Sequence, residues 1–203
     1  EKVVRRIEGH RAVDADTGAA GPDIAIGRAG VWATPGSAEL IELGGKRLFA
    51  RGPASGPVTV KGVRVGVPIC EDIWLEESEE YENVVECLAE TGAEILVVPN
   101  GSPYARDKND LRLSIAVARV TESGLPLVYL NQVGGQDELV FDGASFALNA
   151  DLSVAAQQPA FQEDITTLVW RKDESGWRCK GKVAPLLEGD QGDYAACVLG
   201  TRD

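Results

Sequence analysis

From residue 58 onward, apolar residues follow clear patterns that predict strands and helices in turn. Val63–Ile69 and Glu94–Val98 are nearly continuous apolar runs, which is typical of strands covered on both faces. Glu79–Thr91 and Asp107–Glu122 show helical periodicity, and Leu127–Val133 is a third apolar strand. The order strand, helix, strand, helix, strand predicts an α/β layered fold with helices outside a central sheet.

Each predicted helix has an apolar side and a glycine at its end. Gly92 follows the first helix and Gly124 follows the second, as expected at helix C-termini. The apolar positions are Val84, Val85, Cys87 and Leu88 in the first helix, and Leu111, Ile115, Ala118 and Val120 in the second. We expect these sides of the helices to face the sheet.

The two ends of the chain have weaker patterns. Toward the C-terminus, three segments predict strands that add to the sheet in antiparallel directions, joined by turn residues such as Asp142-Gly143. They are Glu138–Phe141, Ala144–Asn149 and Ile165–Trp170. Before residue 45 the chain is rich in glycine and proline, and it allows only short strands at Asp23–Ile26 and Glu39–Leu43.

Length and charge limit the classes of function. The 203 residues suffice for one large domain with its own hydrophobic core. A formal net charge of −12 repels phosphate backbones and anionic lipid, so we expect no nucleic-acid partner. The apolar runs fall far short of the ~20 residues that a bilayer requires, so no membrane span is expected. The first thirty residues contain no signal-peptide core, and we expect a cytoplasmic protein with reduced thiols.

The cysteines do not form a metal-binding pattern. Cys70, Cys87, Cys179 and Cys197 are widely spaced, include no CxxC pair and have a single histidine, His10, to assist them. We therefore expect no metal site, and we interpret His10 and the last three cysteines as structural.

Cys70 is the first candidate for chemistry because it directly follows the predicted strand Val63–Ile69. The carboxyl ends of strands are where α/β sheets place their ligands. A sharp turn from strand into helix would present the sulfur and direct backbone N–H groups towards an oxyanion on a substrate carbonyl. The alternative is an inert buried cysteine that fills a gap, which is the more common state of a free thiol.

Three segments carry distinctive sequences: GVRVGVPICEDIW (Gly62–Trp74), NVVECLAETGAEILVVPNGSPY (Asn83–Tyr104) and NQVGGQDELVFDGAS (Asn131–Ser145). Together they resemble the nitrilase-like glutaminase domain of glutamine-dependent NAD synthetases. The resemblance runs from about Lys46 to the C-terminus and implies a nitrilase-type α/β/β/α sandwich with mixed sheets. It divides the chain into a divergent or truncated N-terminal segment, residues 1–45, and a glutamine amidohydrolase core, residues 46–203.

The resemblance implies roles for individual residues. In this family the cysteine of the CED turn attacks the side-chain amide of glutamine, so Cys70 is the implied nucleophile. Glu71 would face the amino-acid end of glutamine and offer its N–H to the oxyanion; alternatively, it is a first-turn acid favoured by the helix dipole. Ser102 would hydrogen-bond the substrate, and Lys108 would hold its α-carboxylate. Turn chemistry beside Pro103 and a solvated helix start explain these two residues equally well.

The chain departs from the family in its other catalytic groups. The family uses a glutamate as general base and a lysine near the oxyanion, both upstream of the cysteine. The lysines before Cys70 are Lys2, Lys46 and Lys61, and none has the expected spacing. None of the upstream glutamates, Glu1, Glu8, Glu39 and Glu42, has the family's F-P-E context. The triad is therefore predicted to be incomplete, and each missing group typically costs about 10² to 10⁴ in rate.

The expected function is hydrolysis of glutamine through a thioester on Cys70, which supplies ammonia for ATP-dependent conversion of deamido-NAD to NAD. Expected partners are glutamine, a synthetase domain or partner subunit, and further copies of the chain in a homo-oligomer. The sequence lacks an SGGxDS loop, so we expect no cofactor in this chain, with ATP and Mg²⁺ confined to a synthetase domain. Two alternatives are a free-standing amidase of the same superfamily and a catalytically inactive remnant acting as an oligomerisation module.

Overall fold

The computed structural model describes residues 55–74, 83–136, 138–187 and 189–201, together with the backbone of three strands near the amino end. β1 (Val4–Glu8), β2 (Arg11–Asp14) and β3 (Ala20–Asp23) form an antiparallel sheet in the order β1-β2-β3. The strand predicted at Asp23–Ile26 overlaps β3 at one residue. Its remainder, the strand predicted at Glu39–Leu43 and the division of the chain at residue 45 lie outside the described residues.

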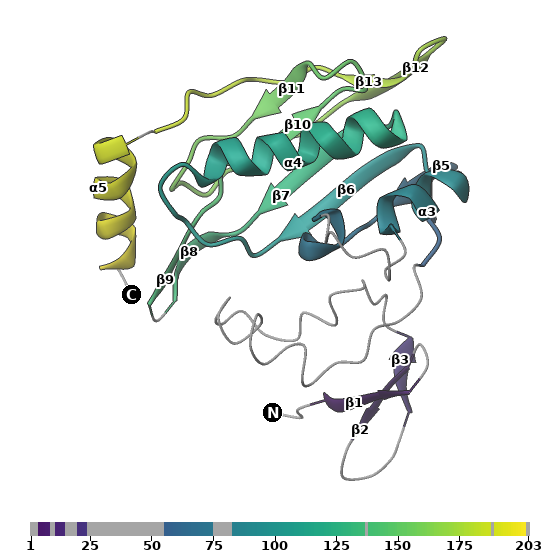
Figure 1. The fold of residues 1–203 in the computed structure, drawn as a ribbon, viewed down its shortest axis with the longest axis horizontal. Coiled ribbons are helices and arrows are strands. Elements are labelled where there is room, and N and C mark those ends of the chain that lie inside the picture. Colours follow the sequence, from purple (N-terminus) through teal and green to yellow (C-terminus); the bar gives the residue numbers. More distant parts are fainter. Residues whose placement is uncertain are drawn as a thin grey trace.

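A six-stranded sheet forms the centre of the molecule, in the order β11-β10-β7-β6-β5-β4 (Figure 1). Its strands are β4 (Val58–Val60), β5 (Val63–Gly66), β6 (Ile95–Asn100), β7 (Leu127–Asn131), β10 (Phe146–Leu148) and β11 (Val154–Gln157). β5, β6 and β7 are parallel, whereas β4, β10 and β11 join in antiparallel directions. The prediction of a mixed sheet is confirmed, and the helices supply the crossovers that parallel strands require.

Two helices pack on one face of this sheet. α3 (Val84–Glu90) precedes β6, and α4 (Lys108–Ser123) connects β6 to β7 (Figure 1). Leu96 and Val98 of β6 share one buried cluster with Val85 of α3 and Val120 of α4, and all four side chains are fully buried. Burial of each such side chain contributes about 1.5–3 kcal/mol, so this layer contains the main core.

The opposite face of the sheet packs against a hairpin near the C-terminus. β12 (Trp170–Asp173) and β13 (Gly176–Cys179) pair antiparallel, and Cys179 belongs to a second buried cluster with Ala147 and Ala156. Ala147 lies between Phe146 and Leu148, which both belong to the cluster on the helical face. Side chains alternate between the two faces of a strand, so Ala147 presents its small side chain to the hairpin.

A second hairpin and the last helix lie together at one end of the sheet (Figure 1). β8 (Val133–Gln136) follows β7 almost directly and pairs antiparallel with β9 (Leu139–Asp142). α5 (Gly189–Gly200) contacts both strands of this hairpin. None of the helices in the described parts of the chain is both long and apolar enough to cross a membrane.

Several predicted elements are present with shifted ends. β6 and α4 lie within two residues of their predicted bounds. β5 ends at Gly66 rather than Ile69, since Pro68 has no N–H group to donate to a neighbouring strand. α3 begins at Val84, because the Asn83 side chain caps it by accepting hydrogen bonds from the N–H groups of Val85 (3.1 Å) and Glu86 (3.3 Å). Residues 79–82 of the predicted helix lie outside the described residues.

The strand predicted at Ile165–Trp170 is wrong. β12 begins only at Trp170, and residues 165–169 have no regular structure. Ile165 is 97% exposed and Val169 is 60% exposed, so this apolar run gains little of the burial that favours a strand. The hydrophobic pattern also does not predict β4, β11, β13 or α5.

The predicted apolar side of α4 is partly wrong. Leu111 is 47% exposed and Ala118 is also exposed, whereas the buried residues of this helix are Arg112, Ala116, Arg119 and Val120. Arg112 and Arg119 are buried because each forms an ion pair, with Asp142 and Glu122 respectively. Sequence periodicity treats arginine as polar, so it places the buried side about one residue away from its true position.

Gly124 and Gly143 provide a matched test of the fold. Both have left-handed backbones (φ 67° and 66°), in which any other L-residue costs about 1–2 kcal/mol. A Cβ at Gly124 would meet nothing within 4 Å, but one at Gly143 would lie 2.3 Å from Cγ2 of Val133. We expect Gly124→Ala to show only the backbone cost and Gly143→Ala to lose about 1–3 kcal/mol more in urea unfolding. Equal losses would show that Val133 moves freely and that the β8–β9 hairpin is loosely packed.

Candidate active site

Cys70 is the first residue of a short 3₁₀ helix, η2 (Cys70–Ile73), which follows β5 after a sharp turn. Its φ of 45° is left-handed, a conformation that is strained for a non-glycine residue. The turn is held by Asp72, whose carboxylate accepts a hydrogen bond from the Ile69 N–H (2.8 Å) and whose own N–H donates to the Ile69 carbonyl (2.9 Å). The chain therefore turns from strand to helix where the sequence predicted.

The ends of three parallel strands meet around Cys70. Gly101, directly after β6, donates its backbone N–H to the Cys70 sulfur. Gln132, directly after β7, is exposed, and its side-chain amide lies 3.6 Å from the position that a Cβ on Gly101 would occupy. The carboxyl edge of a parallel sheet is the usual ligand site of α/β proteins, and here it combines a thiol, a backbone donor and an amide.

The Cys70 thiol is strongly influenced by its surroundings. Its residue is 8% exposed, and burial raises the pKa of Cys70 to about 11. The Gly101 N–H and the positive charge of Lys108 lower this pKa, whereas the negative charges of Glu71 and Asp72 raise it. The neutral thiol is therefore the main form near pH 7, and reaction with a substrate requires a group that removes its proton.

Ser102 and Asn131 join the ends of β6 and β7. The Asn131 side-chain amide accepts a hydrogen bond from the Ser102 N–H (2.9 Å) and donates one to the Ser102 carbonyl (3.1 Å). Asn131 thus continues the hydrogen-bond pattern of the parallel strands past their ends. Its own N–H donates to the Ser145 hydroxyl (2.9 Å), which connects the pair to the antiparallel part of the sheet.

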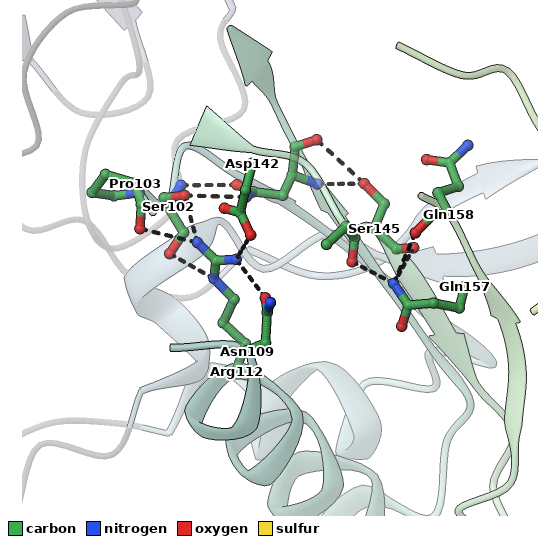
Figure 2. Close-up of polar contacts among 10 residues, drawn as sticks. Ser102, Pro103, Asn109, Arg112, Asp142, Ser145, Gln157 and Gln158 are labelled. Carbon is green, nitrogen blue, oxygen red and sulfur yellow. Dashed lines mark hydrogen bonds and ion pairs between the residues drawn. The ribbon is translucent and has the colours of Figure 1, made fainter. Parts of the chain in front are cut away.

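Arg112 of α4 is the centre of the polar network behind this edge (Figure 2). Its guanidinium donates to the carboxylate of Asp142 (2.8 Å), to the hydroxyl and carbonyl oxygens of Ser102 (3.1 and 2.8 Å), to the carbonyl of Pro103 (3.0 Å) and to the side chain of Asn109 (3.0 Å). Arg112 and Asp142 side chains are 2% and 0% exposed. This buried ion pair fixes the loop that follows Gly101.

Tyr129 of β7 contacts the loop that follows Gly101. Its ring stacks on Phe146 with centroids 5.0 Å apart, and its hydroxyl hydrogen-bonds to the Ser102 side chain. Burial raises the pKa of Tyr129 to about 12, so the hydroxyl stays protonated. The Ser102 hydroxyl is therefore held between Tyr129 and Arg112.

The structure brings three of the four predicted site residues together. Cys70 and Glu71 are adjacent in the turn, and the charge of Lys108 acts on the Cys70 sulfur. Ser102 is nearby but buried, with its hydroxyl held in the network of Arg112, so its contact with substrate stays a prediction. Lys61 lies in the exposed turn before β5, at the end of that strand away from Cys70.

Two contributors to the site, Arg112 and Gly101, were missed by sequence reasoning. Arg112 has no sequence signal that distinguishes it from a surface charge, because it is identified only by its buried partner Asp142. Gly101 could have been found, since it directly follows an apolar strand in the same way as Cys70. Within the parts of the chain that the structure describes, no three His, Cys, Asp or Glu residues are placed to hold a metal ion.

The sequence matches a known protein family and several characterised enzymes. A family model described as carbon-nitrogen hydrolase matches residues 34–171. A glutamine-dependent NAD(+) synthetase from Rhodobacter capsulatus is 50% identical over 159 residues, which cover 77% of this chain and 28% of the relative. The enzyme of the same name from Synechocystis is 37% identical over 164 residues, covering 77% and 29%. The chain thus spans less than a third of the length of these relatives.

Solved structures give the same result for the fold. The glutamine-dependent NAD+ synthetase from Acinetobacter baumannii, in complex with ADP, has a TM-score of 0.69 and 34% identity, covering 83% of this chain and 30% of that one. A carbon-nitrogen hydrolase from Helicobacter pylori has a TM-score of 0.50 and 23% identity, covering 59% and 44%, and is similar in fold alone. The predicted nitrilase-type α/β fold and the resemblance to the glutaminase part of NAD synthetases are confirmed.

The buried ion pair gives a test of stability. Arg112→Met leaves the Asp142 carboxylate buried without its cation, and we expect the free energy of unfolding to fall by about 3–5 kcal/mol. Arg178→Met removes an arginine from an exposed pair with Asp151 and should change stability little. Urea denaturation of both variants measures the difference. Similar losses would contradict a special role of the buried pair.

The Cys70 thiol gives a test of pH dependence. Alkylation requires the thiolate, so iodoacetamide labelling of Cys70 should rise about tenfold per pH unit between pH 7 and 9.5, without a plateau. Lys108→Met should slow labelling about three- to fivefold by raising the pKa of Cys70 further, whereas Lys108→Arg keeps the charge and the rate. Mass spectrometry of the Cys70 peptide measures both effects. A plateau near pH 8 would contradict the raised pKa.

Proposed function

This chain belongs to the carbon-nitrogen hydrolase family, and we propose that it hydrolyses the side-chain amide of glutamine as the ammonia-supplying part of a glutamine-dependent NAD synthetase. The observation that carries the proposal is the placement of Cys70. Its sulfur lies in a strained turn at the carboxyl edge of the sheet, with the Gly101 N–H and the Lys108 charge acting on it. Relatives named glutamine-dependent NAD(+) synthetases support glutamine as the substrate.

The proposed reaction has two stages. In the first, the Cys70 thiolate attacks the amide carbon of glutamine, the carbon–nitrogen bond breaks and the nitrogen leaves as ammonia after taking a proton. In the second, water attacks the resulting thioester, releases glutamate and returns the thiol. The turn after Cys70, with the Glu71 N–H, would stabilise the oxyanion in both stages. A pKa of about 11 means that the first stage needs a base close to the sulfur.

The charges beside Cys70 suit the amino-acid end of glutamine. Lys108 would bind the α-carboxylate, and Glu71 would bind the α-ammonium group. Both charges already act on the sulfur, so both lie near the reacting group. Ser102 would contribute through its backbone and through the position it gives to Gly101, because its hydroxyl is held by Arg112. Glutamine is thereby distinguished from simple amides, which lack both charges.

The remaining parts of the proposal concern the whole protein. Ammonia released at Cys70 would pass to a synthetase domain or partner subunit that uses ATP and Mg²⁺ to convert deamido-NAD to NAD. No ATP or metal chemistry is assigned to the described residues. A cytoplasmic location and assembly into homo-oligomers stay predictions.

A second candidate function is a non-catalytic module. Burial of Cys70 and its high pKa favour the inert thiol, and Lys61 is not placed to act on it. The side chains of Glu1, Glu8, Glu39, Glu42, Lys2 and Lys46 lie outside the described residues. In this case the chain would associate with partner subunits and hydrolyse nothing.

Ammonia release from glutamine tests the proposed function. We expect the chain to release ammonia, at a rate lowered by the predicted absence of the general base and the lysine, and to form γ-glutamyl hydroxamate when hydroxylamine traps the thioester. Cys70→Ala should lower both rates by more than about 10³-fold because the nucleophile is removed. Cys197→Ser, which changes an exposed thiol, is the matched control and should keep the activity.

Other substrates separate the alternatives. Release of ammonia from acetamide or propionamide but not from glutamine would support a free-standing amidase. Self-association in sedimentation experiments, without hydrolysis of any amide, would support the non-catalytic module. Loss of activity in the Cys197 control would show that the assay reports general damage rather than the proposed nucleophile.

A further inference from the structure

The loop formed by residues 101–107 connects β6 to α4, and a group at each of its ends acts on Cys70. At its start, Gly101 donates its N–H to the Cys70 sulfur, and directly after its end, Lys108 begins α4 and places a positive charge near the same atom. The position of each end of this loop therefore affects one of the two contributions. What holds the loop determines the environment of the thiol.

The inner side of the loop is held by the core. Arg112 and Asn131 bind the backbone of Ser102, and the Tyr104 N–H donates to the Val140 carbonyl of β9 (2.7 Å). The contacts of Ser102 are buried, and that of Tyr104 reaches the β8–β9 hairpin. They fix the first half of the loop, up to Tyr104.

The outer side of the loop is held by α5. One carboxylate, that of Asp193, binds two donors of the loop: Oδ1 accepts from the Tyr104 hydroxyl (2.8 Å), and Oδ2 pairs with the Arg106 guanidinium. The α5 backbone also lies close to Tyr104, since a Cβ on Gly192 would be 2.9 Å from the tyrosine hydroxyl oxygen. Asp190 contacts the same arginine (3.2 Å) but is fully exposed.

We propose that α5 positions the second half of the 101–107 loop through Asp193 and thereby sets the placement of Lys108 near Cys70. This inference rests on the proposed role of Cys70 as nucleophile. Asp193 touches neither the sulfur nor a substrate in this scheme, so it is a positioning residue. α5 itself packs on the β8–β9 hairpin. In this proposal, displacement of the helix moves the loop and so changes the reactivity of the thiol.

The ratio of two alkylation rates tests the inference without depending on turnover. Iodoacetate and iodoacetamide both react with the thiolate. The ratio of the iodoacetate rate to the iodoacetamide rate at Cys70 therefore does not depend on the thiolate fraction, and it reports the positive charge beside the sulfur. Lys108→Met defines the ratio when this charge is absent. We expect Asp193→Ala to lower the ratio about two- to threefold, towards the Lys108→Met value.

Asp190→Ala is the matched control, because it removes the same charge from the same helix. It should leave the ratio unchanged or raise it slightly, since it removes only an anion. Tyr104→Phe removes the loop hydroxyl that Asp193 binds, and it should lower the ratio as Asp193→Ala does. It tests the same contact if Asp193→Ala folds poorly. A general loss of stability slows or speeds both reagents equally and leaves the ratio in place.

The outcomes separate this inference from the proposed function. An unchanged ratio in both Asp193→Ala and Tyr104→Phe overturns the positioning role, even if glutamine is hydrolysed. A lowered ratio in a chain that hydrolyses no amide supports the positioning role and removes the proposed function. Equal effects of Asp190→Ala and Asp193→Ala would show a non-specific charge effect and also overturn the inference.

Discussion

The buried pair of Arg112 and Asp142 is the interaction on which the site depends. A guanidinium removed from water must be hydrogen-bonded almost completely, because an unpaired buried charge costs several kcal/mol. Arg112 meets this requirement by binding the loop after β6 as well as Asp142 at the end of β9. The loop is therefore shaped by the needs of a charge in the core. Ser102, and with it Gly101, takes its position as a result.

The same edge of the sheet brings together opposing influences on one thiol. Parallel strands end side by side, so the residues after β5, β6 and β7 become neighbours although they are distant in sequence. Burial and two carboxylates favour the neutral thiol, whereas a backbone N–H and a lysine favour the thiolate. Small movements of these groups change the balance. Both ends of the connection that carries them are tied, one to the core and one to α5.

Some parts of this arrangement follow from the sequence and others do not. Apolar runs and helical periodicity predict β6 and α4 closely, because burial on both faces of a strand leaves a clear pattern. They predict the turn at Cys70 from its place after a strand. They fail for the side of α4 that contains Arg112, since an arginine is recognised as buried only through its partner 30 residues away. They fail at Ile165 because the apolar residue is exposed.

The left-handed backbone of Cys70 has a consequence for how this position can change over evolutionary time. A left-handed backbone costs a cysteine about 1–3 kcal/mol, and glycine would adopt it almost without penalty. Selection for a more stable fold alone would thus favour glycine here, at the loss of the sulfur. A lineage that keeps cysteine in this turn accepts a less stable protein in exchange for a reactive atom.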